Sequence, residues 1–86
     1  MDVKSEIEKT RDALQQQRDE LRVQMHLAKL EAKAEWENTE NQFHSLESKI
    51  REISADASGA SKEIMASAKQ LMHDIEIAYH RIRRHL

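Results

Sequence analysis

Cysteine and proline are absent from this 86-residue sequence, and glycine occurs only once, at Gly59. Without cysteine the chain has no disulfide framework, no thiol nucleophile and no thiolate metal ligand, so the expected environment is a reducing cytoplasm. Aromatic residues make up only 3% of the chain, whereas charged residues make up 35%. This composition is typical of long helices and does not favour turn-rich β structure.

Long apolar runs are also missing. No stretch approaches the roughly 18 uncharged apolar residues of a membrane-spanning helix. The first eight residues, Met-Asp-Val-Lys-Ser-Glu-Ile-Glu, lack the apolar core of a signal peptide. We therefore expect a cytoplasmic protein, or one attached peripherally to the inner membrane, and we treat residues 1–86 as a single coiled-coil unit because so short a chain holds one core.

Apolar or small residues recur at spacings of three and four in the first two thirds of the chain, which predicts one face of a helix over about residues 2–54. A second apolar line, at Val23, Leu27, Leu30 and Ala34, predicts contact with more than one neighbouring helix. The main series is Val3, Ile7, Thr10, Leu14, Gln17, Leu21, Met25, Ala28, Ala32, Trp36, Thr39, Phe43, Leu46, Ile50 and Ile53.

Residues 54–61 read Ser-Ala-Asp-Ala-Ser-Gly-Ala-Ser and contain no large side chain. Glycine supports the left-handed conformation that ends helices, and Ser58 or Ser61 can cap the helix that follows. We predict a turn over about residues 55–60, with the break near Ser58-Gly59, and a shorter helix over about residues 61–84. The fold class is then all-α, a long coiled-coil helical hairpin. The alternative is one continuous helix, because the apolar series continues in phase through Ala57 and Ala60.

A hairpin folded at residues 56–59 places large side chains opposite small ones, such as Trp36 opposite Ala78, and brings Glu35 within reach of His80 and Arg81. The helix–helix core expected from this register is Trp36, Phe43, Leu46, Ile50, Ile64, Leu71, Ile75 and Ile82.

This hairpin covers the first helix only back to about residue 28, so a partner must cover the apolar residues that precede it. We expect a second copy to do so in a symmetric antiparallel dimer, centred near Gln17 because its amides can hydrogen-bond across the symmetry axis. The predicted self-association surface is Val3, Ile7, Leu14, Gln17 and Leu21.

Catalytic constellations are not apparent. None of the five histidines has a glutamate three residues before it, so the di-iron motif of helical bundles is absent. A two-helix hairpin has no concavity that would exclude water from a nucleophile, and no glycine-rich phosphate loop is present. We expect no enzymatic activity, no metal and no cofactor.

The preferred function is therefore self-association or binding of a partner helix, in a structural or adaptor role. The alternative is peripheral binding to a membrane surface through the basic, amphipathic C-terminal helix, with contacts from His80, Arg81, Arg83 and Arg84. Nucleic-acid binding is not favoured, because no aromatic platform is interleaved with these cations.

The stretch from Lys33 to Lys69 contains Ala34-Glu35-Trp36, then Leu46 and Lys49, then Ala57-Ser58-Gly59-Ala60 followed by Lys62. In these residues the chain resembles a group of small, uncharacterised bacterial coiled-coil proteins described as apolipoprotein-like. The resemblance implies a bacterial cytoplasmic helical protein, and it supplies no catalytic residue.

Overall fold

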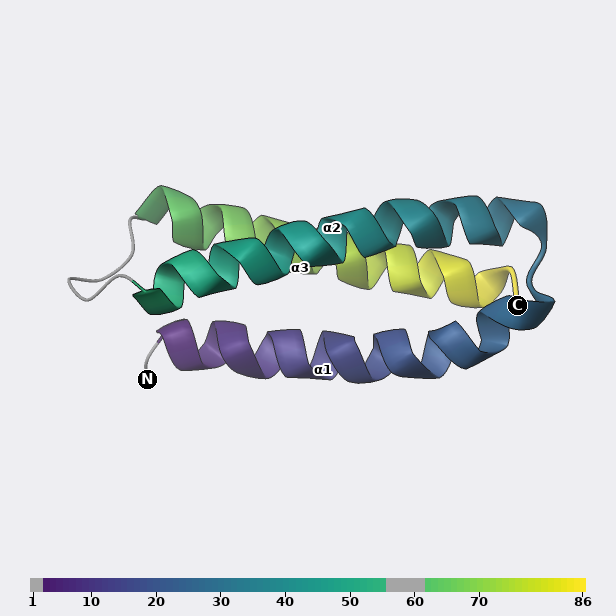
Figure 1. Ribbon diagram of the computed structural model, residues 1–86, viewed down its shortest axis with the longest axis horizontal. Helices are drawn as coiled ribbons and strands as arrows, with labels where there is room; N and C mark the ends of the chain where they lie inside the picture. The colour runs from purple at the N-terminus through teal and green to yellow at the C-terminus, as the bar shows by residue number, and fades with distance from the viewer. Residues whose placement is uncertain (1–2, 56–61) are drawn as a thin grey trace.

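The computed structural model describes residues 3–55 and 62–86, without the side chains of Val3 and Lys4. Three helices pack side by side in a rod that measures 46 × 19 × 17 Å. They are α1 (Val3–Gln24), α2 (Leu30–Ala55) and α3 (Lys62–Arg84), and a short 3₁₀ helix, η1 (Met25–Leu27), joins α1 to α2. As Figure 1 shows, α1 and α3 run in one direction and α2 runs in the other. The described residues contain no strand, so the all-α class is confirmed.

The single helix predicted over residues 2–54 is wrong, because the chain leaves the helix between Gln24 and Leu30 and turns back. Ala28 is extended, with φ −76° and ψ 152°, and its backbone N–H donates to the Met25 carbonyl oxygen at 3.2 Å. The hairpin is therefore a three-helix bundle.

Burial of the apolar face of α1 explains this corner. Ile7, Leu14 and Leu21 are 2%, 2% and 1% exposed, whereas in a straight helix the rest of the chain would leave them in water. Full burial of an aliphatic side chain contributes about 1.5–3 kcal/mol. Three such side chains outweigh the few helical hydrogen bonds that the corner gives up, each of which contributes about 1 kcal/mol net.

The core continues along α2 and α3. Of the core residues expected from the sequence, Phe43, Leu46, Ile75 and Ile82 are buried, and Trp36, Ile50, Ile64 and Leu71 are partly buried and pack against them.

The register between α2 and α3 agrees with the expected one at the ion pair between Glu35 and Arg81. The Arg81 Nη1 atom lies 3.0 Å from Glu35 Oε1. Trp36 stacks on Tyr79, with ring centroids 6.1 Å apart and an interplanar angle of 27°. The predicted break near Ser58-Gly59 and the capping roles of Ser58 and Ser61 lie outside the described residues.

Candidate functional site

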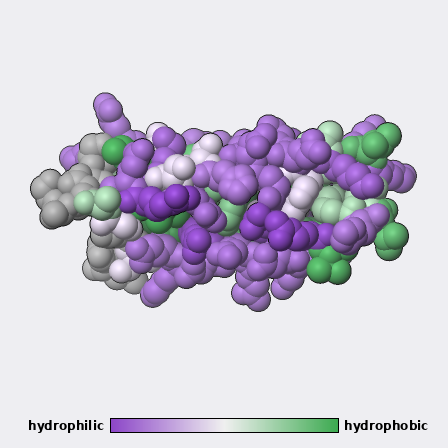
Figure 2. Space-filling model, in the orientation of Figure 1, coloured by the Kyte–Doolittle hydropathy of each residue, from purple (hydrophilic) through white to green (hydrophobic). Residues whose placement is uncertain are grey.

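One end of the bundle carries large apolar side chains that the described part of the chain leaves exposed. We call this surface the tip; it consists of Val23, Leu27, Leu30 and Leu86, which are 72%, 94%, 84% and 46% exposed. It is formed where α1 ends, where α2 begins and just after the end of α3, and these three places lie together in Figure 1. Figure 2 shows apolar side chains gathered at that end, while the middle of the same face is mostly hydrophilic.

The helical period explains why the tip is exposed. Successive residues of a helix are rotated by about 100°, so a residue two places from a buried one points nearly the opposite way. Val23 lies two places from both Leu21 and Met25, which are buried, and Leu30 lies two places before Ala32, which is 0% exposed. Packing of the core thus forces Val23 and Leu30 outward. A shallow hollow beside them is lined by Gln24, Leu27, Ala28, Lys29, His85 and Leu86.

The segments that form the tip carry an excess of positive charge. Residues 22–34 and 82–86 contain five Lys and Arg residues and one Glu, out of totals of 14 basic and 16 acidic residues in the chain. This end therefore has a formal charge of +4, while the remainder of the protein has −6. The five cations are Arg22, Lys29, Lys33, Arg83 and Arg84, all of them exposed. Among the described residues, none of the five forms a salt bridge within 4 Å.

The four residues predicted to contact an anionic surface are divided by the fold. Arg83 and Arg84 lie at the tip in the last turn of α3. Arg81 is engaged by Glu35 on α2, and His80 is exposed further along α3. Arg83 and Arg84 are therefore the two arginines of this group that lie at the tip without a salt bridge among the described residues.

The predicted self-association surface is largely internal. Ile7, Leu14 and Leu21 are covered within one chain, Gln17 is partly buried, and the side chain of Val3 lies outside the described part. In the two-helix hairpin predicted from the sequence, no segment of the same chain reaches these residues. The corner at residues 25–29 brings α2 and α3 to them.

The Arg18 side chain connects α1 to α2 through an ion pair with Glu40. Its Nε and Nη2 atoms donate to the two carboxylate oxygens of Glu40 at 2.6 and 2.7 Å, and its guanidinium carbon lies 5.0 Å from the centre of the Phe43 ring. The hydrogen bond to Arg18 lowers the pKa of Glu40, and the same bond raises the pKa of Arg18. This bidentate geometry is the strong form of an ion pair.

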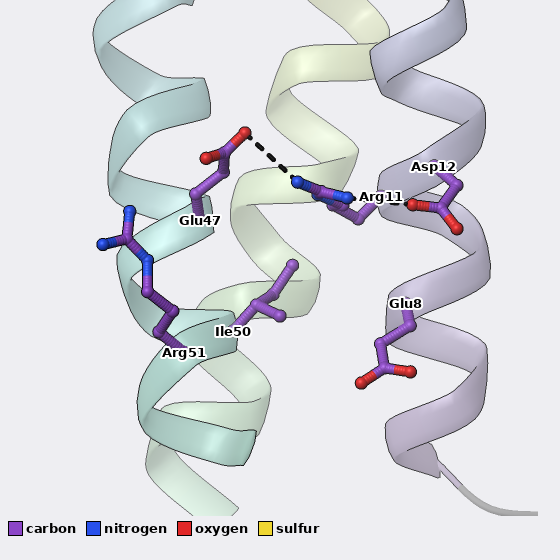
Figure 3. Close-up of a pocket in the computed structure, with 6 residues that line it drawn as sticks. All are labelled: Glu8, Arg11, Asp12, Glu47, Ile50 and Arg51. Carbon is purple, nitrogen blue, oxygen red and sulfur yellow. Dashed lines mark hydrogen bonds and ion pairs between the residues drawn. The ribbon is translucent and has the colours of Figure 1, made fainter. Parts of the chain in front are cut away.

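A second set of charges lies nearer the N-terminus of α1. Arg11 contacts Asp12 at 3.0 Å and Glu47 at 3.5 Å. These residues line a hollow with Glu8, Ile50 and Arg51, in which Figure 3 shows Arg11 placed between the two helices. Asp12 is 69% exposed and Arg11 and Glu47 are 32% and 27% exposed, so water screens these pairs and they contribute little. We assign this hollow a modest structural role.

Other kinds of site receive no support from the described residues. No group of three His, Asp or Glu side chains within residues 3–55 and 62–86 is arranged to hold a metal ion. None of the helices in those ranges combines the length and apolar character needed to cross a bilayer. Burial raises the pKa of the Tyr79 hydroxyl, which in the described structure has no hydrogen-bond partner.

Comparison with protein-family models, with curated protein sequences and with solved structures gives no match to this chain. The resemblance to apolipoprotein-like coiled-coil proteins therefore stays a prediction, and the case for a function depends on the tip.

Sequence patterning identified Val23, Leu27 and Leu30 as a second apolar line but assigned them to packing between helices. A signal for the tip is present in the sequence, because this line is flanked by Arg22, Lys29 and Lys33, yet only the corner shows that none of the described helices covers it.

Proposed function

We propose that this protein is a non-catalytic, peripheral membrane-binding protein that inserts its tip into the headgroup region of anionic bilayers. The observation that carries the proposal is the coincidence of exposed aliphatic side chains with a charge of +4 at the same end of a bundle whose remainder is acidic.

Exposed aliphatic side chains and a basic patch together suffice for reversible attachment to a membrane. Aliphatic side chains contribute about 1.5–3 kcal/mol each when fully removed from water, and each Lys or Arg near an anionic leaflet contributes about 1 kcal/mol. One signal alone gives marginal binding, whereas an apolar anchor combined with a basic patch gives stable binding. The acidic remainder is repelled by the same surface, so the rod is held with its tip toward the lipid.

A membrane fits this surface better than a protein partner does. The tip projects from a helix corner, and Leu27 is 94% exposed. A bilayer deforms around such a projection, whereas a protein partner would need a matching apolar groove bordered by acidic groups. Binding of a partner helix along the apolar series is less favoured, because Ile7, Leu14 and Leu21 are already buried.

Cosedimentation with vesicles tests the proposal. We expect the protein to bind vesicles of phosphatidylcholine with phosphatidylglycerol, not phosphatidylcholine alone, and to release at high salt, which screens the charge attraction. The double variant Leu27→Ser/Leu30→Ser should bind at least tenfold more weakly. Ile77→Ser is the matched control, since Ile77 is 42% exposed but lies on α3 away from the tip.

A second matched pair of variants tests the contribution of positive charge to vesicle binding. Arg83→Gln/Arg84→Gln should weaken binding, whereas Lys62→Gln/Lys69→Gln removes two exposed cations of the same helix at the other end and should have a much smaller effect. No binding to either vesicle, or binding unchanged by Leu27→Ser/Leu30→Ser, would reject the proposal. Binding to polyglutamate but not to vesicles would instead indicate an acidic protein partner.

A further inference from the structure

The corner between α1 and α2 has none of the residues that usually end one helix and begin another. Residues 24–30 read Gln-Met-His-Leu-Ala-Lys-Leu, without glycine or proline. Gln24 makes no side-chain capping hydrogen bond at the start of η1. Lys29, which directly precedes α2, is not one of the Ser, Thr, Asp or Asn residues that cap helices.

Local preference and tertiary packing therefore oppose each other at this corner. Alanine, leucine, methionine, lysine and glutamine are all good helix formers, and Leu21, Met25, Ala28 and Ala32 continue one apolar face without losing phase. η1 is already close to helical, and the departure recorded at Ala28 is a ψ of 152°. A change at a few backbone angles would join α1 to α2 as one helix.

The two ion pairs between α1 and α2 have a common centre in the sequence. Arg18 pairs with Glu40 and Arg11 pairs with Glu47, and residue 29 is midway between the members of both pairs. Two straightened copies that lie antiparallel, with a two-fold axis at Lys29, would form the same pairs between chains.

The apolar residues on either side of that axis are also compatible with antiparallel pairing of two copies. The antiparallel register brings Leu21 of one copy near Trp36 of the other, and Met25 near Ala32, so that apolar side chains face one another along the seam. These residues already belong to the buried or partly buried core of the single chain. Elements that pack within one chain can pack in the same way between two chains.

We infer that two copies of this protein exchange α1, so that α1 of each copy packs on α2 and α3 of the other and the corner becomes helical in both. The dimer restores the helical hydrogen bonds that the corner gives up and keeps the buried contacts of α1. It also separates the elements of the tip, because the end of α1 and the start of α2 become collinear.

Substitution at Lys29 tests whether dimerisation requires a continuous helix. Proline inside a helix removes a hydrogen bond and clashes with the preceding turn, whereas the extended Ala28 is what a residue before proline prefers. Lys29→Pro should therefore retain the compact monomer and weaken the dimer on the order of a hundredfold. Lys29→Ala is the matched control: it removes the same charge but permits the helix. Because two lysines meet at the axis, it should strengthen the dimer.

Sedimentation equilibrium in the absence of lipid gives the mass, and a distance within one chain shows whether α1 has moved. The protein has no native cysteine, so Thr10→Cys/Ser48→Cys introduces two labelling sites at exposed positions. Labelled protein is diluted with excess unlabelled protein, and the spacing is measured by electron–electron double resonance. The sites adjoin Arg11 and Glu47, which pair across α1 and α2 in the compact chain, and would be about 57 Å apart in a straight helix.

Exchange predicts that the long spacing grows with the dimer fraction, more strongly in Lys29→Ala, and is absent in Lys29→Pro. A monomer at every concentration, a dimer that shows only the short spacing, or a dimer unaffected by Lys29→Pro would overturn the inference. If Lys29→Pro loses helicity by circular dichroism, the spacing measured in Lys29→Ala decides. Vesicle binding by the monomer is measured separately, so either proposal can fail alone.

Discussion

Two sets of aliphatic side chains lie within a few turns of each other and have opposite surroundings. Ile7, Leu14 and Leu21 occupy one face of α1 and are at most 2% exposed. Val23, Leu27 and Leu30, around the corner, are at least 72% exposed. The two sets have the same chemistry, so the difference between them comes from which side of the helix the rest of the chain covers.

The buried set stabilises the fold, whereas the exposed set is available for interaction. A buried leucine contributes to folding, whereas a leucine that remains in water contributes almost nothing to it. A cluster of exposed apolar residues is an aggregation liability unless it meets a partner. The predictions below test whether the two sets divide the roles in this way.

Truncation of one leucine from each set should give the largest difference in the free energy of unfolding. Leu14→Ala leaves a cavity in the core and should lower the free energy of unfolding by about 2–5 kcal/mol. Leu27→Ala changes an exposed side chain and should alter it by about 0.5 kcal/mol or less. Urea unfolding followed by circular dichroism measures both. Equal losses would show that the corner is packed in solution.

Loss of the ion pair between Arg18 and Glu40 should have a smaller effect on the free energy of unfolding. Glu40→Gln leaves Arg18, whose side chain is only 14% exposed, without its charged partner, and should lower the free energy of unfolding by about 1.5–3 kcal/mol. Glu37→Gln is the control on the same helix, because Glu37 is exposed, and it should change stability by about 0.5 kcal/mol or less. Similar values for the two variants would mean that the pair is solvated.

The same pair predicts a dependence on pH. The pKa of Glu40 is lower in the folded protein than in the unfolded chain, so the stability from this group is complete above about pH 4.3. It is lost as the pH falls through the lower, folded-state pKa. Unfolding measured between neutral and acidic pH should therefore show a smaller loss in Glu40→Gln than in the unmodified protein. An unchanged acid profile would contradict this assignment.

The smallest effect is expected at Tyr79. Its hydroxyl has no hydrogen-bond partner in the described structure, and the residue is 1% exposed. Tyr79→Phe removes a buried polar atom and preserves the ring that stacks on Trp36, so stability should stay the same or rise by about 1 kcal/mol. Thermal unfolding measures the change. A loss above about 1 kcal/mol would show that a water or a protein group satisfies the hydroxyl.

Much of the pairing between α2 and α3 could be predicted from periodicity and charge. The contact between Glu35 and Arg81 was expected, and so was a core containing Phe43, Leu46, Ile75 and Ile82. Both follow from a short connection, which leaves two amphipathic helices few registers in which large residues meet small ones.

The candidate site was predicted only in part. The cations at Arg83 and Arg84 and the apolar line at Val23, Leu27 and Leu30 were each visible in the sequence, but they are 53 or more positions apart along the chain. Nothing in local patterning brings them together. They become one surface because α1 and α3 run in the same direction and end beside the corner (Figure 1).

The sequence by itself determined that this protein is helical, through the absence of proline, the single glycine and an apolar repeat of three and four residues. Only the tertiary structure decided that residues 3–55 form two α-helices instead of one. Residues 24–30 are compatible with either form, because their local preference favours helix and no residue there forces a turn. The balance is set by Ile7, Leu14 and Leu21, whose removal from water requires distant parts of the chain to be present.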